Sequence, residues 1–259
     1  MYPLHLETQF SNTIRRIFDS YNDVLITVCH DYSVRYYQGH SIKTFLTDIE
    51  KVRDAYISSK QIDNAVKKTL LSFSAWQRKT RNQYLYSQGI KGDALRKDSE
   101  FVKGIINDLF LKQRESFNIL FIGTAKEVYT RFYSEITAGN FITRQDEEVQ
   151  KQGFWASLFG YMKTLSDTIK QQNTNKAVFW ASDQATSSLG QLAKVQQEEV
   201  GIKGYIWRTA RDSKVRDSHR ELEGKYFLWS KGAQMPDGRW VHPGGDYNCR
   251  CVAVPENRG

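Results

Sequence analysis

The C-terminal quarter of the chain holds the residues whose types and spacing could do chemistry. Cys249 and Cys251 are separated by a single residue. In an extended segment, alternate side chains share one face with their Cα atoms about 7 Å apart, which is poor geometry for a disulfide. Two thiolates on one face can instead bind a soft cation, and His219 and His242 would complete a tetrahedral Cys2His2 zinc site. Such a metal would stabilise a small segment that is rich in glycine.

The same residues allow two other interpretations. In the first, the cysteines are small buried hydrophobic residues in a tight corner, and His219 bonds a backbone or carboxylate group. In the second, both histidines join Asp212 and Asp246 in a metal-dependent hydrolase cluster with a histidine as general base, or a cysteine acts as a nucleophile with His242. The sequence contains no His-Glu-x-x-His and no Gly-x-Ser-x-Gly motif. We therefore expect no enzymatic activity.

Short elements must position these groups. Residues 205–207 (Tyr-Ile-Trp) suit a buried strand. Asp212, Arg216 and His219 follow at helical spacing, so we expect a short helix in which Asp212 caps the N-terminus or pairs with Arg216. Gly224 then ends the helix before another strand.

Two further features shape the end of this segment. Pro236-Asp237-Gly238-Arg239 has the composition of a tight turn. Arg250 lies between the two cysteines, so in an extended segment it projects to the opposite face. We expect it to pair with Asp212 or Asp246 and hold the segment in place.

The preceding part of the chain predicts long helices. Pro3 is the only proline before Pro236, and long helices tolerate such a stretch because proline breaks them. Apolar residues recur at helical spacing in two runs: Ile62, Val66, Leu70 and Phe73; and Phe117, Phe121, Ala125, Val128, Phe132 and Ile136. We expect roughly six or seven helices between residues 8 and 200. The expected breaks lie near residues 38–42, 58–60, 89–93, 139–144 and 172–175.

The composition is that of an ordinary globular protein, which excludes collagen-like, mucin-like and fully disordered chains. The chain has 259 residues and a net charge of +8, which favours a location near polyanions. No run approaches the ~18 apolar residues of a membrane-spanning helix, and we expect no secretory signal. Three cysteines cannot all pair within one chain, which suits a reducing compartment or a metal site.

At this point the sequence resembles a known family, that of the phage Mu F-like minor head (head morphogenesis) proteins. Two blocks carry the resemblance: Trp207-x-Thr209-x-x-Asp212-x-x-Val215-Arg216-x-x-His219-x-x-Leu222-x-Gly224, and His242-Pro243-Gly244 with Cys249-Arg250-Cys251. It is strong over residues 177–255 and weaker back to about residue 100. Several members carry cysteines where this chain has Arg216 and His219, which leaves His219 as the only ligand in that pair.

The resemblance implies a minor head protein of a tailed double-stranded DNA phage. Such proteins are made in the host bacterial cytoplasm, associate with the portal and with capsid or scaffold proteins during procapsid assembly, and remain in the head interior near the portal. Their oligomeric state is set by the particle. In some phages they are thought to leave with the DNA, and no catalytic activity is an established property of the family.

We therefore predict a mostly α protein, with a long helical region over residues 1–175 that docks on portal or capsid and a small α+β domain over residues 176–259. The α+β domain would be held together by these residues: Trp207, Thr209, Asp212, Arg216, His219, Gly224, His242, Pro243, Cys249, Arg250 and Cys251. One alternative is a DNA-binding accessory protein of packaging, which contacts double-stranded DNA without sequence preference. Another is a metal-dependent hydrolase that acts during infection.

Overall fold

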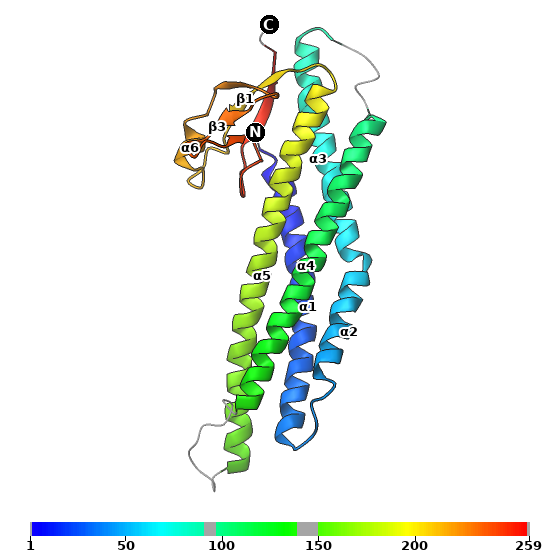
Figure 1. The fold of residues 1–259 in the computed structure, drawn as a ribbon, viewed down its shortest axis with the longest axis vertical. Helices are drawn as coiled ribbons and strands as arrows, with labels where there is room; N and C mark the ends of the chain where they lie inside the picture. Colours follow the sequence, from blue (N-terminus) through cyan, green and yellow to red (C-terminus); the bar gives the residue numbers. More distant parts are fainter. Residues whose placement is uncertain (1, 91–96, 139–149, 258–259) are drawn as a thin grey trace. The chain divides into compact units, whose positions relative to one another are not determined.

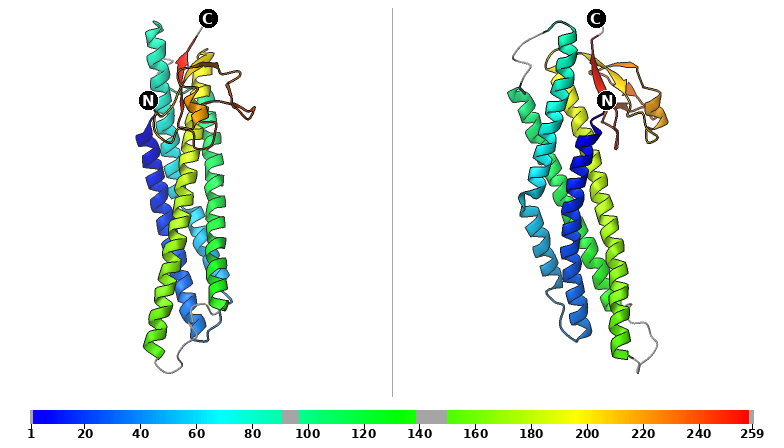
Figure 2. Two further views of the ribbon diagram at one scale, coloured as in Figure 1. Left: turned by 90° about the vertical axis from the view of Figure 1, so that its left-hand side faces the viewer. Right: turned by 180° about the vertical axis from the view of Figure 1, so that it is seen from behind.

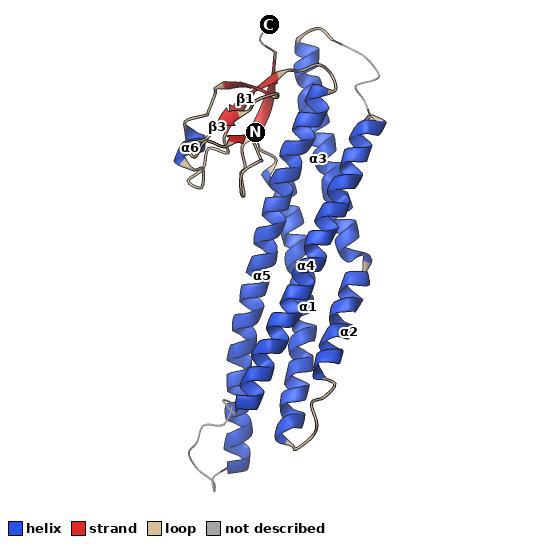
Figure 3. Ribbon diagram, viewed as in Figure 1, coloured by secondary structure: helices blue, strands red, loops and turns tan. Residues whose placement is uncertain are grey.

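The computed structural model describes residues 2–90, 97–138 and 150–257 (Figure 1). It confirms the predicted fold class, because the described chain is mostly helical and ends in a few short antiparallel strands (Figure 3). The helices are α1 (Leu4–Tyr37), α2 (Phe45–Ser58), α3 (Lys60–Ser87), α4 (Glu100–Ala138), α5 (Gln150–Glu198) and α6 (Asp217–Arg220). The strands are β1 (Gly204–Arg208), β2 (Tyr226–Leu228), β3 (Ala233–Gln234), β4 (Trp240–Val241) and β5 (Val252–Glu256).

The predicted helix breaks are confirmed near residues 38–42 and 58–60, where α1 and α2 end. The break near residues 89–93 follows the end of α3, although residues 91–96 lie outside the described chain, as does the break near residues 139–144. The predicted break near residues 172–175 is wrong, because α5 continues through it. The polar run there resembles a linker, but Asn173 donates to Asn22 Oδ1 (3.3 Å) and Thr174 donates to Asp19 Oδ1 (2.7 Å), so these side chains are bonded within the fold.

The chain divides into two compact units. One contains residues 1–13, 63–114 and 179–259, and the other contains residues 14–62 and 115–178. The second unit is helical, and its core includes the stacked rings of Phe18 and Phe121, whose centroids are 4.6 Å apart. Tyr21 in the same core donates a hydrogen bond to the Phe121 carbonyl (2.9 Å). The apolar positions of both predicted helical runs are buried, as their spacing requires.

The first unit contains the strands. β1 is the central strand of a three-stranded sheet and pairs antiparallel with β2 and β5. Its residues 205–207 are buried, which confirms the predicted buried strand. β3 and β4 form a separate hairpin around the predicted turn, where the Met235 N–H bonds the Arg239 carbonyl (2.8 Å). The core beneath the strands is aromatic and centres on Tyr205, Trp207 and Trp229.

The strands lie beside the C-terminal part of α5 in each view (Figures 1 and 2). The buried Gln197 side chain of α5 donates to the Ala253 carbonyl (3.0 Å) and accepts from the Trp229 indole N–H (3.0 Å). Asp183 Oδ1 accepts the Asn248 backbone N–H (2.8 Å). These bonds join the strands to α5 within one unit. The compact units therefore differ from the expected division at residue 175.

A close backbone approach also joins α5 to the segment before the cysteines. Gly190 of α5 faces the Pro243 carbonyl so closely that a Cβ at Gly190 would overlap it. Gly244 has φ +81°, and a Cβ there would lie 2.6 Å from the Thr186 carbonyl oxygen. Gly190 is needed because there is no space for a side chain. Gly244 is needed for the same reason and because its backbone conformation is left-handed. No helix in the described residues is both long enough and apolar enough to cross a membrane.

Candidate functional site

Three buried ligand-type groups of the first unit meet at one point. His219 Nδ1 lies 3.5 Å from Cys249 Sγ and 3.6 Å from Cys251 Sγ. The ligand atoms of the three residues all lie within 4.8 Å of one another, and His219 is only 2% exposed. Both cysteines are free thiols. We call these three residues the Cys2His cluster.

One turn of helix places His219 in the Cys2His cluster. The predicted helix from Asp212 is shorter than expected, because α6 begins at Asp217. Asp212 instead caps a turn, where its Oδ1 accepts the Lys214 N–H (3.0 Å). The His219 ring packs edge-to-face on the buried Trp207 of β1, with centroids 5.5 Å apart. The Trp207 carbonyl accepts the Gly224 N–H (2.8 Å), so β1 contacts this segment at His219 and again after α6 ends.

A tight turn places the two cysteines. The Cys249 N–H donates to the Asp246 carbonyl (3.0 Å). Asn248, which precedes Cys249 in this turn, has φ +49°. Asn adopts this left-handed conformation at little cost. The Gly244 N–H points at Cys249 Sγ (3.4 Å). Cys251 then leads directly into β5.

Asp246 holds the other side of the His219 ring. Its Oδ2 lies 3.3 Å from His219 Nε2, and its carboxylate also faces Arg239 (3.5 Å) and Arg216 (3.9 Å). Burial would raise the pKa of Asp246, but the Tyr247 backbone N–H and the two arginines lower it below its usual value. Asp246 therefore places a carboxylate beside the imidazole, although no hydrogen bond joins it to Nε2.

Contacts within the Cys2His cluster shift the pKa of all three of its residues. The pKa of Cys249 is well below its usual value, because Cys251 and His219 both donate hydrogen bonds to its sulfur against the effect of burial. The same bond and burial raise the pKa of Cys251, and contact with Cys249 raises that of His219. The contacts thus favour the thiolate form at Cys249 over Cys251, and the thiolate is the form of cysteine that binds metals.

His242 is not part of this arrangement. Its Nδ1 is bonded to the Tyr205 hydroxyl (2.9 Å), and its ring packs on Trp229 with centroids 5.1 Å apart. Burial, with a contribution from Lys194, lowers its pKa to about 4. The structure therefore brings together three of the four residues that the sequence suggested as ligands, and places the fourth in the aromatic core.

Other residues in or beside the two sequence blocks make contacts outside the Cys2His cluster. Arg250 pairs with Asp212 (2.7 Å), which was one of its two expected partners. Thr209 donates to Glu223 Oε2 through both its backbone N–H (2.6 Å) and its hydroxyl (2.9 Å). Arg211 also bonds the Glu223 carboxylate (2.8 Å). Sequence reasoning missed Glu223, because nothing in its position separates it from other acids that precede a helix-ending glycine.

The space beside the Cys2His cluster is small. A cavity of about 20 Å³ adjoins it, lined by Ala210, Lys214, Val215, Arg216, Asn248 and Arg250 as well as the cluster. A volume of this size holds about one water molecule. Of the four residues in the hydrolase hypothesis, only His219 and Asp246 are in contact, whereas Asp212 pairs with Arg250 and His242 lies in the aromatic core. The geometry does not assemble that catalytic cluster.

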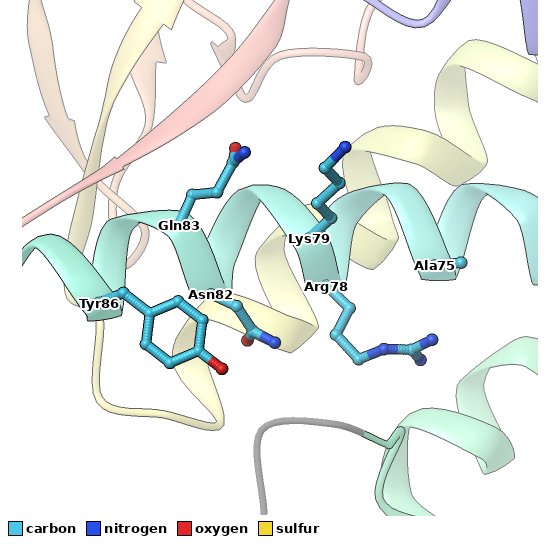
Figure 4. A pocket seen from close by; sticks show the side chains of 6 residues that line it. All are labelled: Ala75, Arg78, Lys79, Asn82, Gln83 and Tyr86. Carbon is cyan, nitrogen blue, oxygen red and sulfur yellow. The ribbon is translucent and has the colours of Figure 1, made fainter. Parts of the chain in front are cut away.

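Two larger hollows in the described residues of the first unit are not lined by a cluster of metal-ligand or catalytic groups. One, of about 360 Å³, is lined only by α3 residues, namely Ala75, Arg78, Lys79, Asn82, Gln83 and Tyr86. Lys79 and Gln83 extend to one side of the helix and the other long side chains to the opposite side (Figure 4). Arg78 is already paired with Asp98 (2.7 Å). The other hollow, of about 500 Å³, is lined by Tyr2, Leu4, the segment 208–212, Arg250 and Val254.

Part of the chain is similar to a family of phage proteins. Residues 128–254 match the family described as Phage Mu protein F like protein, which confirms the predicted resemblance. An uncharacterized protein of Haemophilus influenzae is 34% identical over 136 residues, which cover 49% of this chain and 30% of that protein. The chain thus spans less than a third of the length of this relative. No solved structure matches. The matched family is one of phage head morphogenesis proteins.

Proposed function

We propose that this protein is a minor structural component of a tailed double-stranded DNA phage head, and that it binds the portal or the procapsid during assembly. The observation that carries the proposal is the match of residues 128–254 to the phage Mu F-like family. That segment includes the Cys2His cluster and the strands around it. In this proposal the protein attaches to its partners and stays in the particle, and it catalyses no reaction.

The interior of the first unit supports an architectural role. The Cys2His cluster is buried, and the cavity beside it is too small for a substrate. Its polar groups are directed at one another: Asp246 at His219, and His219 at both sulfurs. A catalytic site needs room for a reacting group next to its acid, base or nucleophile. This arrangement holds the chain together instead.

The second unit offers a surface for docking. On α4, Ile119 is 60% exposed and Ile122 is 46% exposed, and Tyr133 further along is also exposed. These positions fall on one face of the helix by its 100° periodicity. Exposed apolar residues on one helix face are typical of surfaces that bind a partner. We propose that this face contacts the portal or shell protein.

The test is capture of the portal by the full chain. The portal protein of the same phage genome is co-expressed with the tagged chain and the complex is isolated by affinity and size-exclusion chromatography. We expect the wild-type chain to capture the portal oligomer. Ile119→Glu with Ile122→Glu should abolish capture, whereas Thr168→Glu, which adds a charge at an exposed position of α5 and so leaves the α4 face unchanged, should not. Equal capture by all three would reject the α4 face, and no capture of portal or shell protein by the wild type would reject the proposed function.

The net charge of +8 supports a second candidate, contact with packaged DNA. Binding of this kind is independent of sequence and weakens steeply with salt, because each phosphate contact releases counterions. A mobility-shift titration of double-stranded DNA at several salt concentrations measures this slope. Absence of binding at about 50 mM salt would eliminate DNA contact and leave the docking proposal intact.

A further inference from the structure

We propose that the Cys2His cluster is a zinc site, with His219 Nδ1, Cys249 Sγ and Cys251 Sγ as its three protein ligands. This site differs from the Cys2His2 set suggested by the sequence, because His242 is excluded. The inference is independent of the proposed function, since it rests only on the geometry of the first unit.

The first argument is the pair of distances from the imidazole nitrogen. With Zn–S bonds of about 2.3 Å and a Zn–N bond of about 2.0–2.1 Å, tetrahedral geometry separates a nitrogen ligand from a sulfur ligand by about 3.6 Å. The observed separations are 3.5 Å and 3.6 Å. An imidazole nitrogen makes one hydrogen bond along a single direction in the ring plane. Two nearly equal contacts are therefore better explained by one ion at the centre than by two hydrogen bonds.

The second argument is the group behind the histidine. Histidines that bind metals through one ring nitrogen usually donate the other N–H to a carboxylate. Here Asp246 Oδ2 lies 3.3 Å from His219 Nε2. His219 Nε2 is buried and makes no hydrogen bond within the chain. A metal bound at Nδ1 would displace the proton that this nitrogen directs at Cys249 and leave the remaining N–H on Nε2, beside Asp246. The Gly244 N–H at Cys249 Sγ (3.4 Å) is a further outer-sphere bond, of the kind that stabilises a thiolate.

The third argument concerns the fourth coordination position. The cavity of about 20 Å³ beside the Cys2His cluster has room for one water molecule. Asn248 lines this cavity, and both polar atoms of its side chain are buried without a protein partner. A water that coordinates the metal and bonds to Asn248 would satisfy these atoms. Thiolate and imidazole ligands in a tetrahedral set select zinc over magnesium or calcium.

The experiment measures metal in the intact chain. The full-length protein is expressed in zinc-supplemented medium, freed of any histidine tag, and analysed by elemental mass spectrometry. We expect close to one zinc per chain. Cys249→Ser and Cys251→Ser should each lose the metal. Two matched controls should keep it: Cys29→Ser, which changes the buried thiol outside the site, and His242→Gln, which changes the histidine that the structure excludes.

A second measurement covers the case in which a ligand variant fails to fold. Wild-type protein is stripped with a chelator and reconstituted with Co²⁺, whose visible spectrum reports tetrahedral thiolate ligation. We expect thiolate-to-cobalt charge-transfer bands and a tetrahedral d–d pattern that zinc abolishes. Asp246→Asn, which keeps all three ligands, should weaken zinc binding about 10–100-fold in a chelator competition. Folded wild-type protein without zinc and without these cobalt bands would overturn the proposal, as would loss of metal in His242→Gln alone.

Discussion

At the scale of single residues, two histidines of the first unit have pKa values shifted in opposite directions by their neighbours. His219 faces a thiolate and a carboxylate, which raise its pKa. His242 lies among Tyr205 and Trp229 with Lys194 near it, and its pKa falls to about 4. His219 thus lies among charged partners, whereas His242 is a neutral packing residue.

The low pKa of His242 predicts a pH dependence of stability. Below about 6.5 the unfolded chain binds a proton at this histidine, while the folded chain does not until the pH approaches 4. The free energy of unfolding should therefore fall as the pH drops from about 6.5 towards 4. Urea unfolding at several pH values measures this loss. His242→Gln should show a smaller decline over this window, and an identical decline in both proteins would contradict the assignment.

Glu223 gives the second prediction at this scale. Its carboxylate accepts bonds from Thr209 and two arginines, which outweigh burial and lower its pKa to about 2. The stabilisation is present above about pH 4.5 and is lost as the pH falls towards 2. We expect Glu223→Gln to lower the free energy of unfolding at pH 7 by about 1–2 kcal/mol, because the two half-buried Thr209 donors lose a charged acceptor, whereas the exposed arginine pairs add little. Chemical denaturation of both proteins measures this difference in the free energy of unfolding. Glu221→Gln, at an exposed neighbour, should change little, and equal effects would contradict this role.

The sequence predicts part of the candidate site for a physical reason. Cys249 and Cys251 share one face of an extended segment, so their proximity follows from local geometry. That His219 joins them, and that His242 does not, depends on packing against Trp207 and Trp229 respectively. Spacing along the chain carries no information about such contacts.

At the scale of elements, apolar periodicity correctly predicts helices, whereas the polar residues 171–175 led to a helix break being predicted where α5 continues. The buried stripes of α3 and α4 lie where the spacing requires. The continuity of α5 through residues 172–175 could not be predicted, because Asn173 and Thr174 find partners on α1 that local sequence does not reveal. Likewise α6 is a single turn, since Asp212 forms its own turn and pairs with Arg250.

The contact between α5 and the Pro243 loop gives a prediction about glycines in one helix. Gly→Ala at an open helix position stabilises by up to about 1 kcal/mol. Gly160 of α5 is exposed with open space around it, so Gly160→Ala should raise the melting temperature. At Gly190 the new methyl would overlap the Pro243 carbonyl, so Gly190→Ala should lower it. Thermal unfolding followed by circular dichroism compares the two. A rise in both would show that the loop does not pack on α5 as described.

At the scale of the whole molecule, the family match extends beyond the strands. It begins at residue 128, so it includes α4 and α5 residues of the second unit as well as the Cys2His cluster of the first. In this chain the matched residues are therefore helical as well as α+β. They contain the Cys2His cluster, whereas Ile119 and Ile122 of the proposed docking face lie before them.

The most direct test of this account is quantitative mass spectrometry of purified phage heads. Particles are produced from a host that carries the complete phage genome, and peptides of this chain are counted against those of the portal protein. We predict that the chain is present in procapsids and mature heads at a small, reproducible ratio to the portal. Its absence from both kinds of particle, while it accumulates in the infected cell, would contradict a structural role in the head.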